Sequence, residues 1–75
     1  MSTVAATSTD ELPAAQTLRR GLAILRLLAR AQAGLRVSDI GRRLGMAKAT
    51  AVRLTQALAA EGFVVHDELT RGYRL

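Results

Sequence analysis

Two glycines four residues apart, Gly41 and Gly45, constrain the fold of this chain more than any other feature of its sequence. A glycine that can adopt positive φ ends one helix and begins a tight turn. A small residue four positions earlier allows a second helix to approach closely. Apolar residues surround the two glycines at helical spacings: Ile40, Leu44, Met46, Ala51, Leu54 and Leu58. The pattern predicts two helices that cross over a tight turn, which is a helix-turn-helix.

A further helix is expected before this pair. Leucines recur at spacings of four and three residues ahead of Gly34, at Leu18, Leu22, Leu25 and Leu28, and Ile24 and Leu27 widen the stripe. This spacing predicts a helix over Leu18–Ala33, with Thr17 as its N-cap and Gly34 at its C-terminal end. Residues 1–15 are rich in Ser, Thr and Ala and are expected to form a mobile lead-in.

The helices of the pair are expected over Val37–Leu44 and Lys48–Glu61, and the residues after Gly62 change period. Two β-prone runs, Phe63–His66 and Gly72–Leu75, flank a polar stretch of five residues, 67–71, and so predict a hairpin. The expected fold class is therefore mainly α with a small β-hairpin wing. It is a three-helix winged helix-turn-helix over residues 16–75.

The net charge of +5 conceals a denser local signal. Between Gln16 and Ala60 the only acid is Asp39. The basic residues of the same stretch are Arg19, Arg20, Arg26, Arg30, Arg36, Arg42, Arg43, Lys48 and Arg53. Such density on a compact domain points to a polyanionic partner, with nucleic acid first and an anionic membrane surface second. For Arg26 we expect a solvated role on the polar side of the first helix.

Several classes of function find no support in the sequence. The chain has no cysteine and one histidine, His66, so we expect no disulfide, no zinc site, no other metal and no cofactor. Neither paired acids nor a phosphate-cradling loop is present, and so short a chain has little room for a catalytic cleft, so no enzyme is expected. No secretory signal and no apolar run of ~20 residues occurs, and a cytoplasmic location is expected. His66 is expected to lie on the surface beside the hairpin.

The helix over Lys48–Glu61 is the candidate recognition helix, because the N-terminal part of the second helix in such a pair enters the major groove of DNA. Arg53 and Gln56 are the expected base readers, since an arginine can grip guanine O6 and N7 bidentately. An ordinary solvated role suits Gln56 equally well. Val52 is expected to be exposed and to pack on a thymine methyl, and Ala49 lies on the same outward side at the helix start.

Other residues are expected to grip the DNA backbone without reading sequence. Lys48 and Thr50 lie in the first turn of the recognition helix and are expected to contact phosphates. Of Arg42 and Arg43, late in the preceding helix, one is expected to meet a phosphate and the other to stay in solvent. Arg71, at the hairpin tip, is expected to reach the minor groove or a flanking phosphate.

Residues 18–75 resemble the N-terminal domain of IclR-type bacterial transcription regulators. The first helix is similar to SLxRALxIL, the pair to LTEIARRLGLPKSTVHRLLxTL and the wing to GYVxRDPxTGxYRLG. The matching residues are Leu18, Arg20, Leu22, Ile24, Leu25, Ile40, Arg43, Leu44, Gly45, Lys48, Thr50, Arg53, Leu54, Leu58, Gly62, Asp67, Thr70, Tyr73, Arg74 and Leu75. The resemblance implies sequence-specific binding of double-stranded DNA at palindromic operators. It also implies homodimers that pair through the first helix and through a C-terminal region beyond this chain, with no small molecule bound here.

The chain departs from the family pattern at five positions. Arg36 stands where the family has a serine cap, so the helix that follows lacks that side-chain cap. Ala47 replaces a proline, and Ala49 replaces a serine whose hydroxyl would suit a phosphate. Val52 replaces a histidine-like base reader, and the wing glycine follows Arg71 instead of preceding it.

Two alternatives remain open at the level of sequence. The first is a different family of winged-helix regulators, which would bind DNA by the same mechanism. The second is a winged-helix adaptor that binds proteins. A basic recognition face nearly free of acid argues against the adaptor, because the faces of adaptors are usually mixed or apolar.

Overall fold

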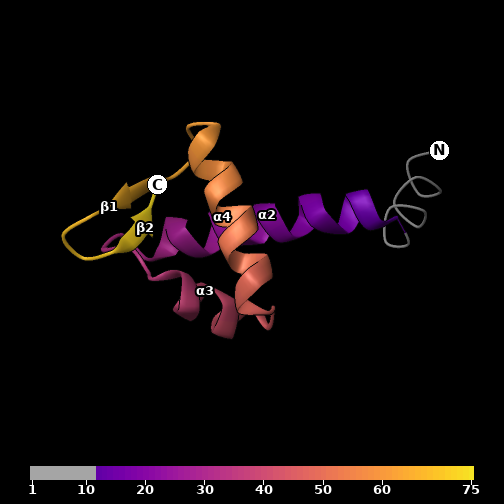
Figure 1. The fold of residues 1–75 in the computed structure, drawn as a ribbon, viewed down its shortest axis with the longest axis horizontal. Coiled ribbons are helices and arrows are strands. Elements are labelled where there is room, and N and C mark those ends of the chain that lie inside the picture. Colours follow the sequence, from indigo (N-terminus) through magenta and orange to yellow (C-terminus); the bar gives the residue numbers. More distant parts are fainter. Residues whose placement is uncertain (1–11) are drawn as a thin grey trace.

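The computed structural model describes residues 12–75, and these form three helices and a two-stranded antiparallel hairpin. The elements are α2 (Pro13–Arg30), α3 (Val37–Leu44), α4 (Lys48–Ala60), β1 (Val65–Asp67) and β2 (Gly72–Arg74). α2 runs along the molecule, α4 crosses it, α3 packs against both, and the hairpin lies at the end away from the N-terminus (Figure 1). The predicted fold class, a mainly α winged helix-turn-helix, is confirmed.

The start of α2 differs from the prediction. Thr17 is not an N-cap: it lies inside the helix, and its Oγ1 donates to the carbonyl oxygen of Pro13 at 3.1 Å. The N-cap is Leu12, and Pro13 occupies the first helical position, where its fixed φ and missing N–H suit a helix start. Residues 13–15 of the expected lead-in therefore form the first turn of α2, and residues 1–11 lie outside the described residues.

The end of α2 also comes earlier than predicted, at Arg30 instead of Ala33. The amide of Ala31 donates to the Leu28 carbonyl at 3.1 Å, and the amide of Gly34 donates to the Ala31 carbonyl at 2.8 Å. These bonds carry the chain through a turn to Gly34, whose φ is 89°. Gly34 does adopt the positive φ predicted for it, but the helix ends one turn before this glycine.

Only the C-terminal part of the predicted apolar stripe of α2 is buried. Ile24, Leu27 and Leu28 are enclosed in the core, whereas Leu18 and Leu22 of the predicted stripe are 63% and 41% exposed. The reason is the position of the crossing: α3, α4 and β2 pack near the C-terminal part of α2, and its first turns extend beyond them (Figure 1). Ile40 of α3 and Val64, which precedes β1, complete the core.

The hairpin is shifted by about one residue from the prediction. Its register pairs Val65 with Arg74 and Asp67 with Gly72, so Asp67 belongs to a strand and not to the loop, and Leu75 lies beyond β2. The loop folds back on Asp67, whose carboxylate accepts the amide of Leu69 at 2.9 Å. Acceptance of a backbone N–H two residues on is the usual way an aspartate closes such a turn.

A third backbone segment joins the hairpin at β2. Leu35 and Tyr73 exchange two hydrogen bonds, Leu35 N to Tyr73 O at 2.9 Å and Tyr73 N to Leu35 O at 2.7 Å. The sequence predicted only an extended link at this point. The contact is so close that a Cβ on Gly34 would lie 2.9 Å from the Tyr73 oxygen. The wing is therefore fixed to the link between α2 and α3.

Thr55 of α4 generates a stability prediction. Its side chain is fully buried, and among residues 12–75 its Oγ1 finds no hydrogen-bond partner. Thr55→Val removes the unsatisfied hydroxyl and keeps the shape, so it should stabilise the fold by about 1 kcal/mol and raise Tm by roughly 4–8 °C. Thr55→Ser keeps the hydroxyl, loses the methyl and should lower Tm. Thermal unfolding followed by circular dichroism measures both, and a lower Tm for Thr55→Val would contradict the argument.

Candidate nucleic-acid interface

The turn between α3 and α4 fixes the interface. Gly45 ends α3 with φ 68°, the left-handed conformation that glycine adopts without strain. Gly41 is buried, and a Cβ there would lie 3.0 Å from the carbonyl oxygen of Met46 and 3.5 Å from the Cβ of Ala51. The amide of Met46 donates to the Gly41 carbonyl at 2.9 Å. Both glycine roles predicted from the sequence are confirmed, and α3 keeps its predicted bounds.

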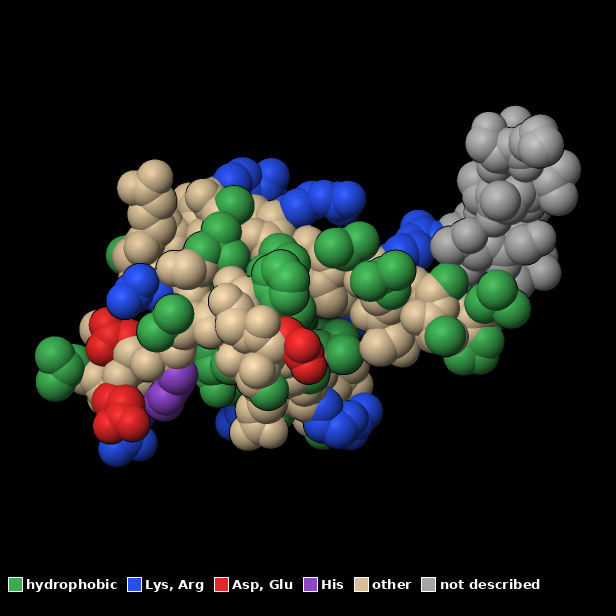
Figure 2. Space-filling model, turned by 90° about the horizontal axis from the view of Figure 1, so that it is seen from above, with side chains coloured by type: hydrophobic (Ala, Val, Ile, Leu, Met, Phe, Trp, Pro, Cys, Tyr) green, Lys and Arg blue, Asp and Glu red, His purple; other side chains and the backbone are tan. Residues whose placement is uncertain are grey.

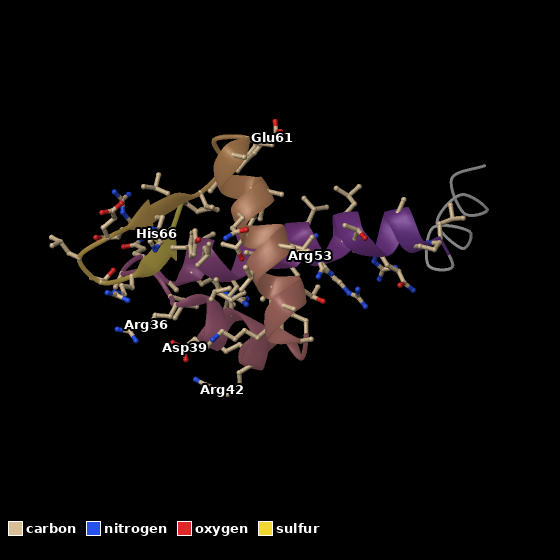
Figure 3. The ribbon with its side chains drawn as sticks, in the orientation of Figure 1. Arg36, Asp39, Arg42, Arg53, Glu61 and His66 are labelled. Atoms are coloured by element: carbon tan, nitrogen blue, oxygen red, sulfur yellow. The ribbon has the colours of Figure 1, made fainter. Side chains whose placement is uncertain are left out.

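α4 presents one side to solvent. Ala51 and Thr55 face the core, whereas Ala49, Arg53 and Gln56 are exposed. Helical spacing places these three on one face, opposite the buried pair. Figure 3 shows Arg53 extending from the middle of the helix. The structure thus brings the two expected base readers and Ala49 onto a single surface, and α4 ends at Ala60, one residue before the predicted end.

Val52 departs from its expected position. It was predicted to be an exposed apolar residue, but it is half-buried on the flank of α4. Seven residues separate it from Ala59, which packs against the core, so both lie on the side of the helix nearest the core. Val52 therefore offers less apolar surface to a partner than its sequence position suggested.

The N-terminal turn of α4 is open to an anion. Ala47 is its N-cap and forms no side-chain cap hydrogen bond, and the first turn carries no acidic residue. The unpaired N–H groups and the dipole of a helix start favour negative charge. Lys48 is exposed at this end and Thr50 is half-buried beside it. The two expected phosphate contacts therefore lie where the helix itself attracts an anion.

Arg42 and Arg43 differ in their contacts. Both side chains are exposed on α3, but Nη2 of Arg42 donates to Oδ1 of Asp39 at 2.5 Å, forming an ion pair. Within residues 12–75, no ion pair competes with a ligand for the guanidinium of Arg43. The sequence analysis predicted that one of the two contacts a phosphate, and the geometry favours Arg43 for that contact.

The basic side of α2 lies beside the turn, which sequence analysis missed. Arg20 and Arg26 line an open depression of about 710 Å³ together with Leu44 and Met46. Arg20 also borders a second depression of about 430 Å³ with Thr50 and the turn. From its position in the sequence, Arg26 was expected to have only a solvated role. No local signal could have placed these arginines, because their surroundings depend on how α2 crosses α4.

The wing tip combines charge with backbone strain. Arg71 is exposed, and among the described residues it is the only non-glycine residue with positive φ, at 60°. This conformation is costly for a side chain with a Cβ. Leu69 beside it is 96% exposed. His66 is exposed, as expected, and its ring lies 4.7 Å from that of Tyr73 between centroids.

Within residues 12–75, no group of histidine, aspartate or glutamate residues is arranged to hold a metal ion. None of the helices in this range is long and apolar enough to cross a membrane.

Comparison with known proteins shows to which family this chain is similar. Residues 17–68 match the model of the IclR helix-turn-helix domain. The chain is 45% identical over 60 residues to the glycerol operon regulatory proteins of Streptomyces coelicolor and Streptomyces griseus. It is 38% identical over 60 residues to an HTH-type transcriptional regulator of Mycobacterium tuberculosis. No solved structure matches the chain significantly.

The matched residues make up 80% of this chain but only 24% of each glycerol operon regulator and 23% of the mycobacterial protein. The chain thus spans about a quarter of the length of these relatives. The family match covers most of α2, the helix-turn-helix and the first strand of the wing. By name, two of the relatives are regulatory proteins of an operon and the third is a transcriptional regulator.

The strained wing residue generates a prediction. Arg71→Gly removes the strain of a positive φ, which stabilises the fold, but glycine loses more backbone entropy on folding, which destabilises it. The two effects oppose each other, so the free energy of unfolding should stay within about 1 kcal/mol of the parent's. The loss of a wing cation should weaken DNA binding and make the slope of log affinity against log salt less negative by about one. Arg71→Lys keeps both the charge and the strain and should bind like the parent. Equal affinity and slope for Arg71→Gly and the parent would exclude a DNA contact at the wing tip.

Proposed function

Because the chain belongs to the family of IclR helix-turn-helix domains, and so is a DNA-binding domain of transcription regulation, we propose that α4 reads operator DNA in the major groove. The observation that carries the proposal is the exposed face of α4, which holds Arg53 and Gln56 in register behind a start that attracts anions. The turn at Gly41 and Gly45 sets the angle at which this face is presented. The domain acts in the cytoplasm, where bacterial chromosomal DNA lies.

The proposed roles divide into reading and gripping. Arg53 reads a guanine, and Gln56 reads a neighbouring base from the next turn of α4. Lys48 and Thr50 hold phosphates at the start of the helix. Arg43 and Arg71 hold the backbone on either side, from α3 and from the wing tip. Ala49 and Val52 fill space against the base edges, with Val52 limited by its partial burial.

Substitution of Arg53 and Lys48 tests this division. The parent chain, with about four phosphate contacts, should show a slope of log affinity against log salt of roughly −3 to −4. Arg53→Ala should cost about 1–3 kcal/mol on the cognate operator and relax preference at one base pair, because a bidentate base contact is lost. Lys48→Ala should weaken all sequences nearly equally and make the slope less negative by about one. Fluorescence anisotropy on cognate and scrambled duplexes at two salt concentrations measures all three quantities.

Two outcomes would contradict the proposal. A slope near zero for the parent would remove the electrostatic basis of DNA binding altogether. An equal loss of affinity by Arg53→Ala on both duplexes would make Arg53 a phosphate clamp and leave Gln56 and Val52 to carry the specificity. The cognate duplex for these measurements comes from selection of bound sequences out of a random pool with the full-length parent protein.

We further propose that the domain acts as a homodimer on a palindromic operator, since a two-fold protein matches a two-fold site. The surface involved is the exposed N-terminal part of α2. There Leu18 and Leu22 border a shallow apolar groove of about 190 Å³, and Leu25, Leu54 and Leu58 close its floor. Figure 2 shows hydrophobic side chains along this end of the molecule. Ile24, Leu27 and Leu28 of the same helix are enclosed in the core and offer no surface for pairing.

Self-association of the isolated chain tests this surface. The chain should dimerise weakly in the millimolar range, because the exposed apolar area is small. Replacement of Leu18 and Leu22 together by glutamine should abolish the association. Leu69→Gln removes an equally apolar but isolated side chain, 96% exposed on the wing, and should leave it unchanged. Sedimentation equilibrium measures both, and a strict monomer throughout, or equal loss in the two variants, would exclude α2 as the interface.

A further inference from the structure

Asp39 occupies an unusual place on the basic surface. It is the only acidic residue between Gln16 and Ala60. It lies in the first turn of α3 and forms an ion pair with Arg42, three residues later. Figure 3 shows Arg36, Asp39 and Arg42 following one another along α3. A carboxylate is thus paired with an arginine on the helix expected to cross the DNA backbone.

The usual role of an acid at this position is absent here. Asp39 is the third residue of α3, where an acidic side chain often bonds back to the helix start as half of a capping box. The other half of that box is a serine or threonine at the N-cap, and Arg36 stands there without a side-chain cap hydrogen bond. Within the part of the chain that the structure describes, the Asp39 carboxylate accepts a hydrogen bond from Arg42.

The exposure of the two partners differs. The Asp39 side chain is 32% exposed and the Arg42 side chain 72% exposed. An ion pair this open to water adds little to the stability of the fold. Its electrostatic effect on an approaching phosphate is larger, because the carboxylate opposes the phosphate directly and cancels the charge of the arginine beside it.

We propose that Asp39 limits the affinity of this domain for the DNA backbone by holding Arg42, and this rests on the DNA-binding function proposed above. Arg42 can meet a phosphate only if it leaves Asp39, whose carboxylate then needs a counterion of its own. The exchange releases no net cation, so Arg42 contributes nothing to the salt dependence of binding. Arg43, next to it, carries the phosphate contact from α3. Asp39 acts by positioning Arg42 and touches no DNA itself.

Asp39→Asn tests the proposal, because it keeps the size of the side chain and removes its charge. On a duplex of scrambled sequence the variant should bind more tightly than the parent, and its slope of log affinity against log salt should be more negative by about one. That slope makes the gain roughly threefold to fourfold larger at 50 mM than at 200 mM salt. Arg42→Ala alone leaves the Asp39 carboxylate without its counter-charge and should bind no better than the parent, whereas the double variant, which lacks both charges, should lose the gain and bind like the parent. This double-mutant cycle separates the pair from either residue alone.

Glu61→Gln is the matched control, since it changes the net charge by the same amount at the C-terminal end of α4, the end away from the turn with α3. Figure 3 shows Glu61 there, far from Asp39. α4 has 13 residues and spans ~20 Å, about two screening lengths at 0.1 M salt, so this control should leave affinity within twofold of the parent. If Asp39→Asn loses helix content by circular dichroism, Asp39→Ser replaces it, because serine also hydrogen-bonds well at a helix start.

The results distinguish this inference from the function on which it rests. A parent that binds duplex DNA with a steep salt slope, together with a neutral variant that binds no better, overturns the role of Asp39 alone. An equal gain for Glu61→Gln, or a gain that survives Arg42→Ala, also overturns it by showing a general charge effect. A parent without salt-dependent binding overturns both the inference and the proposed function.

Discussion

The close approach of α3 and α4 at Gly41 is the contact on which the rest of the structure depends. The backbone of Met46 lies so near Gly41 that a Cβ would meet its carbonyl oxygen at 3.0 Å. Gly45 turns the chain immediately before, and the amide of Met46 donates to the Gly41 carbonyl. Together these contacts fix the direction in which α4 leaves the turn. Ala51 can then enter the core, and the opposite side of α4, for which we propose the contact with DNA, is left exposed.

Features that depend on local chemistry were predictable from the sequence. Gly45 fixed the end of α3 because a left-handed residue is needed just there, and both bounds of that helix were correct. The start of α2 was also marked locally, by Pro13, since proline is favoured at the first position of a helix. Thr17 competed with that signal, and a threonine inside a helix can instead bond back to a carbonyl one turn earlier, as it does here.

Features that depend on how elements cross were not predictable. The leucine stripe of α2 is continuous in sequence, but only its C-terminal part meets other elements, so Leu18 and Leu22 stay exposed. The arginines beside the turn and the partial burial of Val52 have the same cause. The choice between Arg42 and Arg43 required the position of the Asp39 carboxylate, which the spacing of three residues allowed but did not fix. The roles of these residues on DNA remain predictions.

The pairing of Leu35 with Tyr73 gives the wing a mechanical role. Leu35 directly precedes Arg36, the N-cap of α3, so the hairpin is bonded to the base of the helix-turn-helix and cannot swing as a separate flap. On the contacts proposed for α4 and Arg71, the gap between the helix and the wing tip is therefore set before DNA arrives, and the duplex has to supply the adjustment. A wing held at a fixed distance from α4 is sensitive to the width of the grooves and to the ease with which the duplex bends. Base pairs that the protein never touches can therefore influence the affinity for a site.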